Sequence, residues 1–442
     1  MKWLKLLINL RSSFWFVPSL IVALSVALAF ALIELDSGGT GVWRERWPRM
    51  FGAGADGARL MLSTLAGSMI SITGITFSMT LIALTLAAGQ YSSRILRTFM
   101  RSRVTQVTLG VFAGVFAYCL IVLKTVRVGD EVEFVPALAT FFGLVLALGG
   151  VSVLIYFLHH IATSIQATSI VSTIAAETIA SVERVFTREL AHAVDEDAPR
   201  VLRSLESLRW QAVSAPTSGY IQSIDDVALL RLAQERKTIV RMERGIGEFV
   251  VQDTDLASFA QAQPVDREGQ LRLSKCYSIG RFRTVDQDPA FGIRQIVDIA
   301  LKALSPGVND TWTAVICLDY LTAILVRLAS RELPQLCRYA EDELRVVAIA
   351  PSFEGLVSDA FSEIRRSAAG NVTTLAHMLR ALAVIGGRTR SRARRKALRQ
   401  QLHQIAELVE QSVPSKRDRA GLERVLDQVR ESLAPDPLQP AM

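Results

Sequence analysis

The chain has 442 residues, of which 50% are hydrophobic and 21% charged, and its formal net charge is +7. This length suggests two or three structural units at roughly 150 residues each. A basic chain raises the question of nucleic acid, but aromatic residues are only 7% of the sequence and the arginines cluster beside hydrophobic segments. We therefore expect anionic lipid head groups, and no nucleic acid, as partners of the basic residues.

Four segments in the N-terminal third are apolar and long enough to cross a hydrocarbon core of about 30 Å, which takes about 20 helical residues. They are Phe14–Ile33, Leu60–Ala88, Val107–Leu123 and Phe134–Leu158. The sequence thus predicts an α-helical integral membrane protein, with four transmembrane helices in residues 1–160 and a soluble α+β region after them.

The charges that flank these segments predict their orientation, because lysine and arginine are retained on the cytoplasmic side. The second loop and the N-terminus are basic, and the third loop is mainly acidic, so both termini are expected in the cytoplasm. The residues concerned are Lys2, Lys5, Arg11, Arg94, Arg97, Arg101 and Arg103 inside, and Asp130, Glu131 and Glu133 outside with Lys124 and Arg127. The arginines of the first loop oppose this assignment, although tryptophans there suit an interfacial belt; these residues are Arg44, Arg46, Arg49, Arg59, Trp43 and Trp47.

The first segment has a second interpretation, a cleaved signal peptide, because a basic start precedes an apolar run that ends in Ala29-Phe30-Ala31. The run is longer than the ~7 to 15 residues usual for a signal peptide, and further spans follow it. Cleavage would leave the C-terminal half in the cytoplasm. Free thiols are then expected for Cys119, Cys276, Cys317 and Cys337, which contain no C-x-x-C pair.

The second apolar segment is rich in glycine, serine and threonine. Gly67, Ser71, Gly74 and Ser78 recur at steps of four and three, which places them on one helix face. Such a face favours close packing of helices, within one chain or between subunits. Alternatively it lines a polar pathway around an oligomer axis, where hydroxyl oxygens replace part of the hydration shell of an ion. A proton relay is disfavoured, because no ionisable residue interrupts this segment.

A helical connector that continues the fourth segment is expected over residues 161–210, since Ile161 to about Val194 contains no proline or glycine and turns from serine-, threonine- and alanine-rich to charged. His159 and His160 lie at its start and are interpreted as interfacial residues, because two adjacent histidines point to different helix faces and do not make a metal site. No metal and no cofactor are predicted for this chain.

Residues 211–285 change to short β-type runs separated by turns, which predicts a small β-rich module. A strand is expected near 218–224, a helix capped by Asp225 or Asp226 to about Glu235, and a strand over 238–243. Gly245, Gly247 and the run 248–251 suggest a further hairpin. The pattern is similar to lipoyl or biotinyl half-barrels, but no lysine stands at a hairpin tip, where such carriers are modified.

Residues 286–434 are expected to form a helical cytoplasmic domain. Asp288 followed by Pro289 predicts a helix start, and Ser305-Pro306-Gly307 predicts its end. Asn309 or Asp310 caps the next helix. Arg388–Arg399 carries seven basic residues without interleaved aromatics, as is typical of a solvated face near a membrane. Two amphipathic stripes then predict a helical hairpin broken at Pro414. Residues 435–442 are expected to form a disordered tail.

The motif Ala303-Leu304-Ser305-Pro306-Gly307-Val308-Asn309-Asp310 resembles the uncharacterised bacterial membrane proteins of the domain-of-unknown-function family 2254 (DUF2254). The resemblance extends over nearly the whole chain, through Phe14-Trp15-Phe16-Val17-Pro18 and Leu109-Gly110-Val111-Phe112. Members commonly have proline after the Asn-Asp pair, where this chain has Thr311. The resemblance implies a bacterial inner-membrane location and a domain layout, and it implies no established activity.

The polar residues around the start and the end of the helix at 289–303 have two interpretations. Guanidinium groups and a helix N-terminus converging on one point would make an anion or phosphate site. Caps, turns and salt bridges alone would make a structural joint between the β-rich module and the helices. The residues are Arg281, Arg283, Asp286, Asp288, Asn309 and Asp310.

Catalysis has no support from the sequence, which lacks a nucleophile elbow, a P-loop, a paired zinc motif and a dinucleotide fingerprint. Two non-enzymatic functions remain. One is a homo-oligomeric channel with a cytoplasmic vestibule or gate, and the other is a membrane-anchored scaffold or sensor that binds a ligand or protein partner.

Overall fold

A computed structural model describes residues 15–38, 54–90, 103–127, 134–164, 166–186, 203–333 and 335–434. The chain divides into two compact units, Met1–Ser169 and Ile170–Met442. Several residues used for the sequence predictions lie outside the described ones. They are Lys2, Lys5, Arg11, Phe14, Trp43, Arg44, Arg46, Trp47, Arg49, Arg94, Arg97, Arg101, Asp130, Glu131, Glu133, residues 187–202 and the expected tail 435–442.

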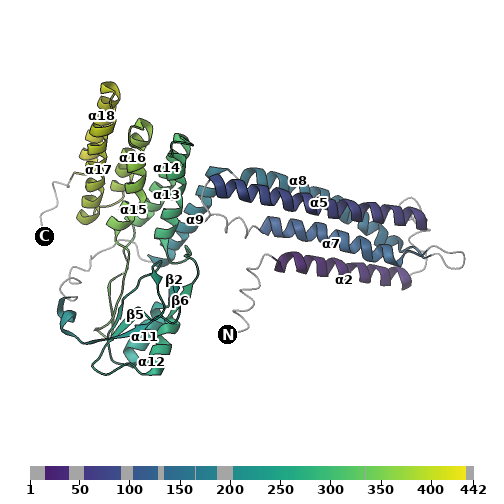
Figure 1. Ribbon diagram of the computed structural model, residues 1–442, viewed down its shortest axis with the longest axis horizontal. Helices are drawn as coiled ribbons and strands as arrows, with labels where there is room; N and C mark the ends of the chain where they lie inside the picture. The colour runs from purple at the N-terminus through teal and green to yellow at the C-terminus, as the bar shows by residue number, and fades with distance from the viewer. Residues whose placement is uncertain are drawn as a thin grey trace. The chain divides into compact units, whose positions relative to one another are not determined.

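In its described residues, the first unit contains four long apolar helices (Figure 1). They are α2 (Phe16–Gly38), α5 (Ala55–Gln90), α7 (Arg103–Thr125) and α8 (Ala137–Ser164). Helices α5 and α7 contain the segments expected at 60–88 and 107–123, and α2 and α8 cover most of those expected at 14–33 and 134–158. The expected count of four transmembrane helices is not confirmed. Five helices among the described residues are long and apolar enough to cross a membrane, because α14 (Thr311–Ala329) of the second unit also meets this criterion. The sequence places this helix within the expected helical cytoplasmic domain of residues 286–434.

Helix α7 is the centre of the first unit, because it packs against α2, α5 and α8. Phe112, Tyr118 and Val122 of α7 are fully buried, and Leu62 of α5 lies in the same hydrophobic cluster. The hydroxyl of Tyr118 donates a hydrogen bond of 2.6 Å to the carbonyl of Ala139. A side-chain donor therefore links α7 to the first turn of α8.

A pair of glycines lets α7 approach α2. A Cβ added to Gly110 would lie 2.8 Å from Ile21 Cδ1, and one added to Gly114 would lie 2.5 Å from Ser25 Oγ. These two glycines are four residues apart, the spacing that allows close helix contact in membranes. The α2–α7 contact thus uses a small-residue motif that the sequence analysis did not single out.

The carboxylate of Asp36, near the end of α2, caps the start of α8. It accepts hydrogen bonds from the N–H groups of Leu138 and Ala139 at 3.2 and 3.0 Å. The first N–H groups of a helix have no partner within the helix, so this carboxylate satisfies two of them from a different helix.

Helix α9 (Ala167–Val185) is separate from α8. The expectation of one continuous helix from Ile161 onward is therefore wrong, because α8 ends at Ser164. Within the second unit α9 lies against α13 (Pro289–Ala303), where the Thr178 hydroxyl occupies the space in which a Cβ of Gly292 would stand. Ser181 Oγ also donates to the carbonyl of Asp286 at 3.2 Å.

Two β-sheets form the first part of the second unit. The larger has the order β1-β5-β3-β8-β7 and the smaller the order β4-β2-β6. All pairs are antiparallel except β3 with β8, which are parallel. The strands are β1 (Trp210–Ser214), β2 (Gly219–Ile224), β3 (Val240–Met242), β4 (Phe249–Val250), β5 (Asp255–Ala260), β6 (Tyr277–Gly280), β7 (Cys337–Ala340) and β8 (Glu343–Val347).

The two sheets share one hydrophobic core with helices α11 (Asp226–Glu235) and α12 (Arg267–Cys276). The predicted strand and helix around Asp225 are confirmed: Asp225 accepts from Ala228 N and begins α11. A short 3₁₀ helix, η1 (Leu205–Ser207), precedes β1. The alternation that predicted strand β3 is also confirmed, since Val240 and Met242 are buried.

Two features of the sheets differ from the sequence expectation. The predicted hairpin after Gly245 is wrong, because β4 pairs with β2 in the other sheet. Residues 286–434 were expected to be helical throughout, yet β7 and β8 lie within them and complete the larger sheet. Pairing between β3 and β8 joins residues about a hundred positions apart, and short-range patterns do not report such contacts.

The C-terminal part of the second unit is a stack of three helical hairpins. Helices α13, α15 and α17 form one layer, and α14, α16 and α18 form the other. The loops between paired helices lie at one end of the stack (Figure 1). The remaining helices are α15 (Phe353–Ser367), α16 (Val372–Gly386), α17 (Arg392–Ser412) and α18 (Lys416–Ser432). The predicted hairpin broken at Pro414 is confirmed as α17 and α18.

Each of these six helices begins with a side-chain cap that accepts the N–H group three residues on. The caps are Asp288, Asp310, Ser352, Asn371, Ser391 and Ser415. Replacement of such a residue by alanine costs about 1 kcal/mol. The regularity of these caps is why the helix starts could be predicted from the sequence.

Substitution of Gly292 by alanine is expected to destabilise the second unit by about 1–3 kcal/mol, because the new methyl group overlaps the Thr178 hydroxyl. Thermal unfolding of the purified full chain measures the effect. Gly307→Ala is the matched control, since a Cβ there meets nothing within 4 Å. The double variant Gly292→Ala/Thr178→Ala should recover part of the loss, and a Gly292→Ala protein as stable as the unmodified chain would contradict the α9–α13 contact.

Candidate functional site

The small-residue stripe of α5 points away from the rest of the first unit. Gly67, Ser71, Gly74 and Ser78 are all exposed, and a Cβ added to either glycine would meet nothing within 4 Å. The buried face of α5 contains Leu62, Ala66, Met69 and Thr76. At about 100° per residue this face is centred roughly opposite the stripe. The described part of the chain therefore does not use the stripe for packing.

Several hydroxyl groups on α5 donate to carbonyls of their own helix. Ser71 Oγ donates to Gly67 O at 2.8 Å, and Thr64, Ser68 and Thr80 make the same bond one turn back. Their hydrogens are thus already used, and the oxygens retain lone pairs. On the stripe itself, the Ser71 oxygen can therefore accept a further hydrogen bond or coordinate a cation.

The segment before α13 contains a buried ion pair between Arg283 and Asp288. Arg283 Nε and Nη2 donate to the two carboxylate oxygens at 2.9 and 3.0 Å, and Asp288 also accepts from Phe291 N at 3.1 Å. Only 5% of the Asp288 side chain is exposed. Burial raises the pKa of Asp288, whereas the guanidinium and the Phe291 N–H lower it. The carboxylate is therefore held by one cation and by the start of α13.

Arg281 and Asp286 lie near this pair but do not join it. The Arg281 guanidinium lies 5.5 Å from the centre of the Phe282 ring. The Asp286 carboxylate is 82% exposed and 4.0 Å from Arg184, and its carbonyl accepts from Arg184 at 3.2 Å. These contacts connect α9 to the loop that precedes α13.

Asn309 and Asp310 lie at the other end of α13. Since α13 has 15 residues, its ends are about 22 Å apart. Asp310 N donates to the carbonyl of Ala303 at 2.8 Å, and Asp310 caps α14 through Thr313. The Thr313 hydroxyl and N–H lower the pKa of Asp310. Asn309 has a positive φ of 49°, a conformation that asparagine tolerates well. The six polar residues are thus divided between two places.

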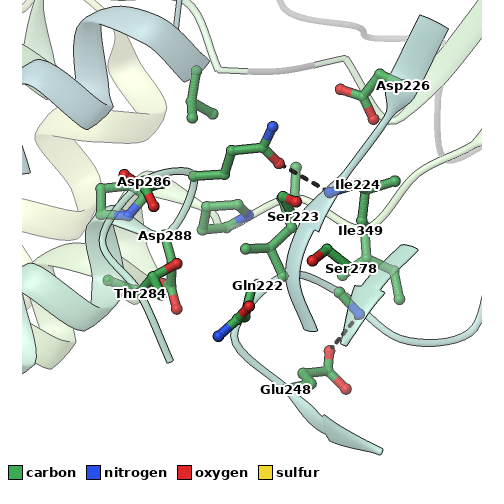
Figure 2. A pocket seen from close by; sticks show the side chains of 18 of the residues that line it. Gln222, Ser223, Ile224, Asp226, Glu248, Ser278, Thr284, Asp286, Asp288 and Ile349 are labelled. Carbon is green, nitrogen blue, oxygen red and sulfur yellow. Dashed lines mark hydrogen bonds between the residues drawn. The ribbon is translucent and has the colours of Figure 1, made fainter. Parts of the chain in front are cut away.

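A cleft of about 690 Å³ opens beside the Arg283–Asp288 pair. Figure 2 shows Gln222, Ser223 and Ser278 from the smaller sheet and Thr284 and Asp286 from the loop before α13 around it. The Gln287 carboxamide accepts from Ile224 N at 3.0 Å, and it joins the loop to β2. The apolar lining comes mainly from Val185, Ile224, Met242, Ile246, Pro289, Ile349 and Pro351.

The charges in the cleft are largely paired with one another. Three arginines face four carboxylates: Arg184, Arg283 and Arg338 with Asp226, Glu248, Asp286 and Asp288. Arg338 contacts Asp226 at 2.8 Å, in addition to the pairs already described. With a net negative lining, and with Arg283 and Arg338 already bonded to carboxylates, the cleft suits a neutral or zwitterionic molecule better than a phosphate.

The described residues contain no group of three or more histidine, cysteine, aspartate or glutamate side chains able to hold a metal ion. Burial raises the pKa of Cys276 to about 11 and that of Cys317 to about 12, so both remain thiols at neutral pH. All four cysteines are buried, and none of them forms a disulfide.

Comparison with known proteins identifies a family but no activity. The family model described as a predicted membrane protein, DUF2254, matches residues 11–384. Uncharacterized proteins of Mycobacterium bovis and Mycobacterium tuberculosis are 31% identical over 420 residues, covering 93% of this chain and 79% of each relative. No solved structure matches the chain.

Arg283→Gln is expected to destabilise the second unit by about 2 kcal/mol, because it leaves the buried Asp288 carboxylate without its cation. The midpoint of thermal unfolding should fall by several degrees. Arg281→Gln is the matched control and should change the midpoint little, since surface substitutions usually stay within about 0.5 kcal/mol. An equal change of the unfolding midpoint in the two variants would contradict a stabilising role of the Arg283–Asp288 pair.

Proposed function

Because the chain belongs to the DUF2254 family of predicted membrane proteins, we propose that it forms a homo-oligomeric permeation pathway in the bacterial inner membrane. Helices α2, α5, α7 and α8 cross the bilayer, and both termini and the second unit face the cytoplasm. The protein acts without catalysis, as a passage for water or small cations.

Helix α14 does not cross the bilayer in this proposal. Its packing partners α13 and α16 have 15 residues each, and they span about 22 Å, which is less than the ~30 Å hydrocarbon core. Helix α13 also carries Arg294, which pairs with Asp298 at 2.9 Å and with Glu363 of α15. A helix surrounded by such neighbours belongs to a water-exposed stack.

The exposed stripe of α5 is the observation that carries the proposal. In α7 the glycine pair is already occupied by Ile21 and Ser25 of α2, whereas the α5 stripe has no such neighbour in the described part of the first unit. Small residues on an exposed membrane helix allow another helix to approach closely. A second copy of α5, or a ring of copies, would use the stripe.

The chemistry of the stripe supports a pathway for water or cations. Residues 60–90 contain no charged side chain or histidine, and the oxygens of Ser71 and its neighbours retain lone pairs after bonding to the helix. The stripe from Gly67 to Ser78 extends for about 17 Å along α5. Hydroxyl oxygens over this length can replace part of a hydration shell.

Substitution of Ser71 by leucine is expected to disrupt assembly or reduce flux by about ten-fold or more, because the larger side chain fills the stripe. The subunit number in detergent and cation flux in liposomes measure the two effects. Ser68→Leu is the matched control: Ser68 is exposed on α5 and bonds to Thr64, but it lies about a quarter-turn from the stripe. A monomeric unmodified protein without flux would exclude the pathway.

A second candidate function is ligand sensing, and the cleft in the second unit is the observation that favours it. Its volume of about 690 Å³ falls in the range of small-molecule sites. Sensing predicts that a small neutral or zwitterionic ligand raises the unfolding temperature of the full chain. Ser278→Trp, which places a large ring in the cleft, should abolish this shift, and an unchanged shift would exclude the cleft as its source.

A further inference from the structure

Exposed basic side chains belong to the segments that come together where the end of α14 meets the start of α17. Arg327 lies in the last turn of α14, Arg388 and Arg390 in the α16–α17 connection, and Lys396 in α17, and all four are exposed. We call this cluster the basic joint. In the part of the chain that the structure describes, none of the four forms a salt bridge with an acidic side chain.

A buried arginine holds the basic joint together. Arg394 is 7% exposed, and its guanidinium donates to the carbonyls of Leu328, Ala329 and Arg331 at 3.1, 2.8 and 2.6 Å. It also lies 5.2 Å from the centre of the Phe353 ring. The last carbonyls of a helix otherwise have no partner within the helix. Arg394 therefore holds the start of α17 against the end of α14. The exposed basic residues next to it belong to these packed segments.

Exposed apolar and small side chains accompany the cations. Val384, in the last turn of α16, is 54% exposed, and Ala393 is exposed in the first turn of α17. Residues 388–399 contain no aromatic side chain, and stacking on bases is a main source of affinity for single-stranded nucleic acid. Cations with a few apolar side chains and no aromatic ring are the composition that suits a lipid head-group region.

We propose that the basic joint docks on the surface of an anionic bilayer. Each arginine or lysine near such a surface is attracted by its negative potential. The proposal rests on the proposed membrane insertion of the first unit. Because the two units belong to one chain, an inserted first unit keeps the second unit at a high effective concentration beside the bilayer. It does not depend on a permeation pathway, so a protein without flux would leave it standing.

Energy transfer from a label on the basic joint to a head-group acceptor lipid tests the docking in the full chain. The reporter is Ala393→Cys, and the four native cysteines are buried. Vesicles of phosphatidylcholine alone are compared with vesicles that also contain phosphatidylglycerol. Transfer from residue 393 is expected to rise about two-fold with the anionic lipid, and to fall back at about 1 M salt, where the Debye length is about 3 Å.

Ala369→Cys is the matched control, because Ala369 is also exposed but lies in the α15–α16 turn at the other end of the helical stack. Transfer from residue 369 should not respond to the anionic lipid. Replacement of Arg388, Arg390 and Lys396 by glutamine should abolish the response of residue 393.

Three outcomes would overturn the proposal. They are equal transfer in both vesicle types, a response that survives the triple substitution, and a triple variant that only loses stability, as expected if these cations merely offset helix dipoles. If the triple variant fails to fold, the salt titration of the single-cysteine protein decides alone. Binding of a DNA oligonucleotide with unchanged transfer would also reject the bilayer as the partner.

Discussion

The bonded pair of Arg283 and Asp288 is the interaction on which the second unit depends. Asp288 begins α13 by accepting from Phe291 N, and Arg283 holds its carboxylate from the preceding loop. Gly247, at a φ of +84°, lies against both side chains, so that a Cβ there would overlap the carboxylate. One buried ion pair thus joins the loop after β3, the loop after β6 and the first helical hairpin. Both residues of the pair also line the cleft.

The first unit illustrates how the same kind of motif can serve different contacts. Gly110 and Gly114 of α7 are filled by side chains of α2, so their small size has an explanation within one chain. The stripe of α5 lies on the face opposite the buried one, and the Ser71 hydroxyl on it bonds to its own helix. Self-bonded hydroxyls satisfy the requirement that polar groups at membrane depth find partners. They also make the stripe compatible with lipid, which is why assembly and flux have to be measured together.

Arginine has two separate roles in the C-terminal helical stack. Arg394 is buried and fastens helix ends together, whereas Arg388 and Arg390 are exposed beside it. A run of basic residues in a sequence does not distinguish these roles, because burial of one member depends on the carbonyls that another helix presents. The proposed docking on lipid uses only the exposed members. The proposed pathway uses the first unit, so docking does not require flux, although both proposals need the first unit in the membrane.

Much of the local structure follows from the sequence itself. The apolar segments indicate the long helices, and capping residues such as Asp225, Asp288 and Asp310 indicate helix starts, because each acts through atoms three residues away. The alternation at Val240 and Met242 likewise identifies β3. Family resemblance was also detectable, and the family comparison agrees with it.

Tertiary structure alone decided which of these elements meet. The partner of β3 is β8, the partner of β4 is β2, and the cap of α8 is Asp36 of α2. Of the polar residues around α13, four precede the helix, and Asn309 and Asp310 follow it about one helix length away. Only Arg283 and Asp288 bond to each other. Periodicity and caps act over a few residues, whereas sheet order, clefts and buried ion pairs depend on contacts between distant segments. The helices of this protein could therefore be predicted from sequence, and the arrangement of its polar residues could not.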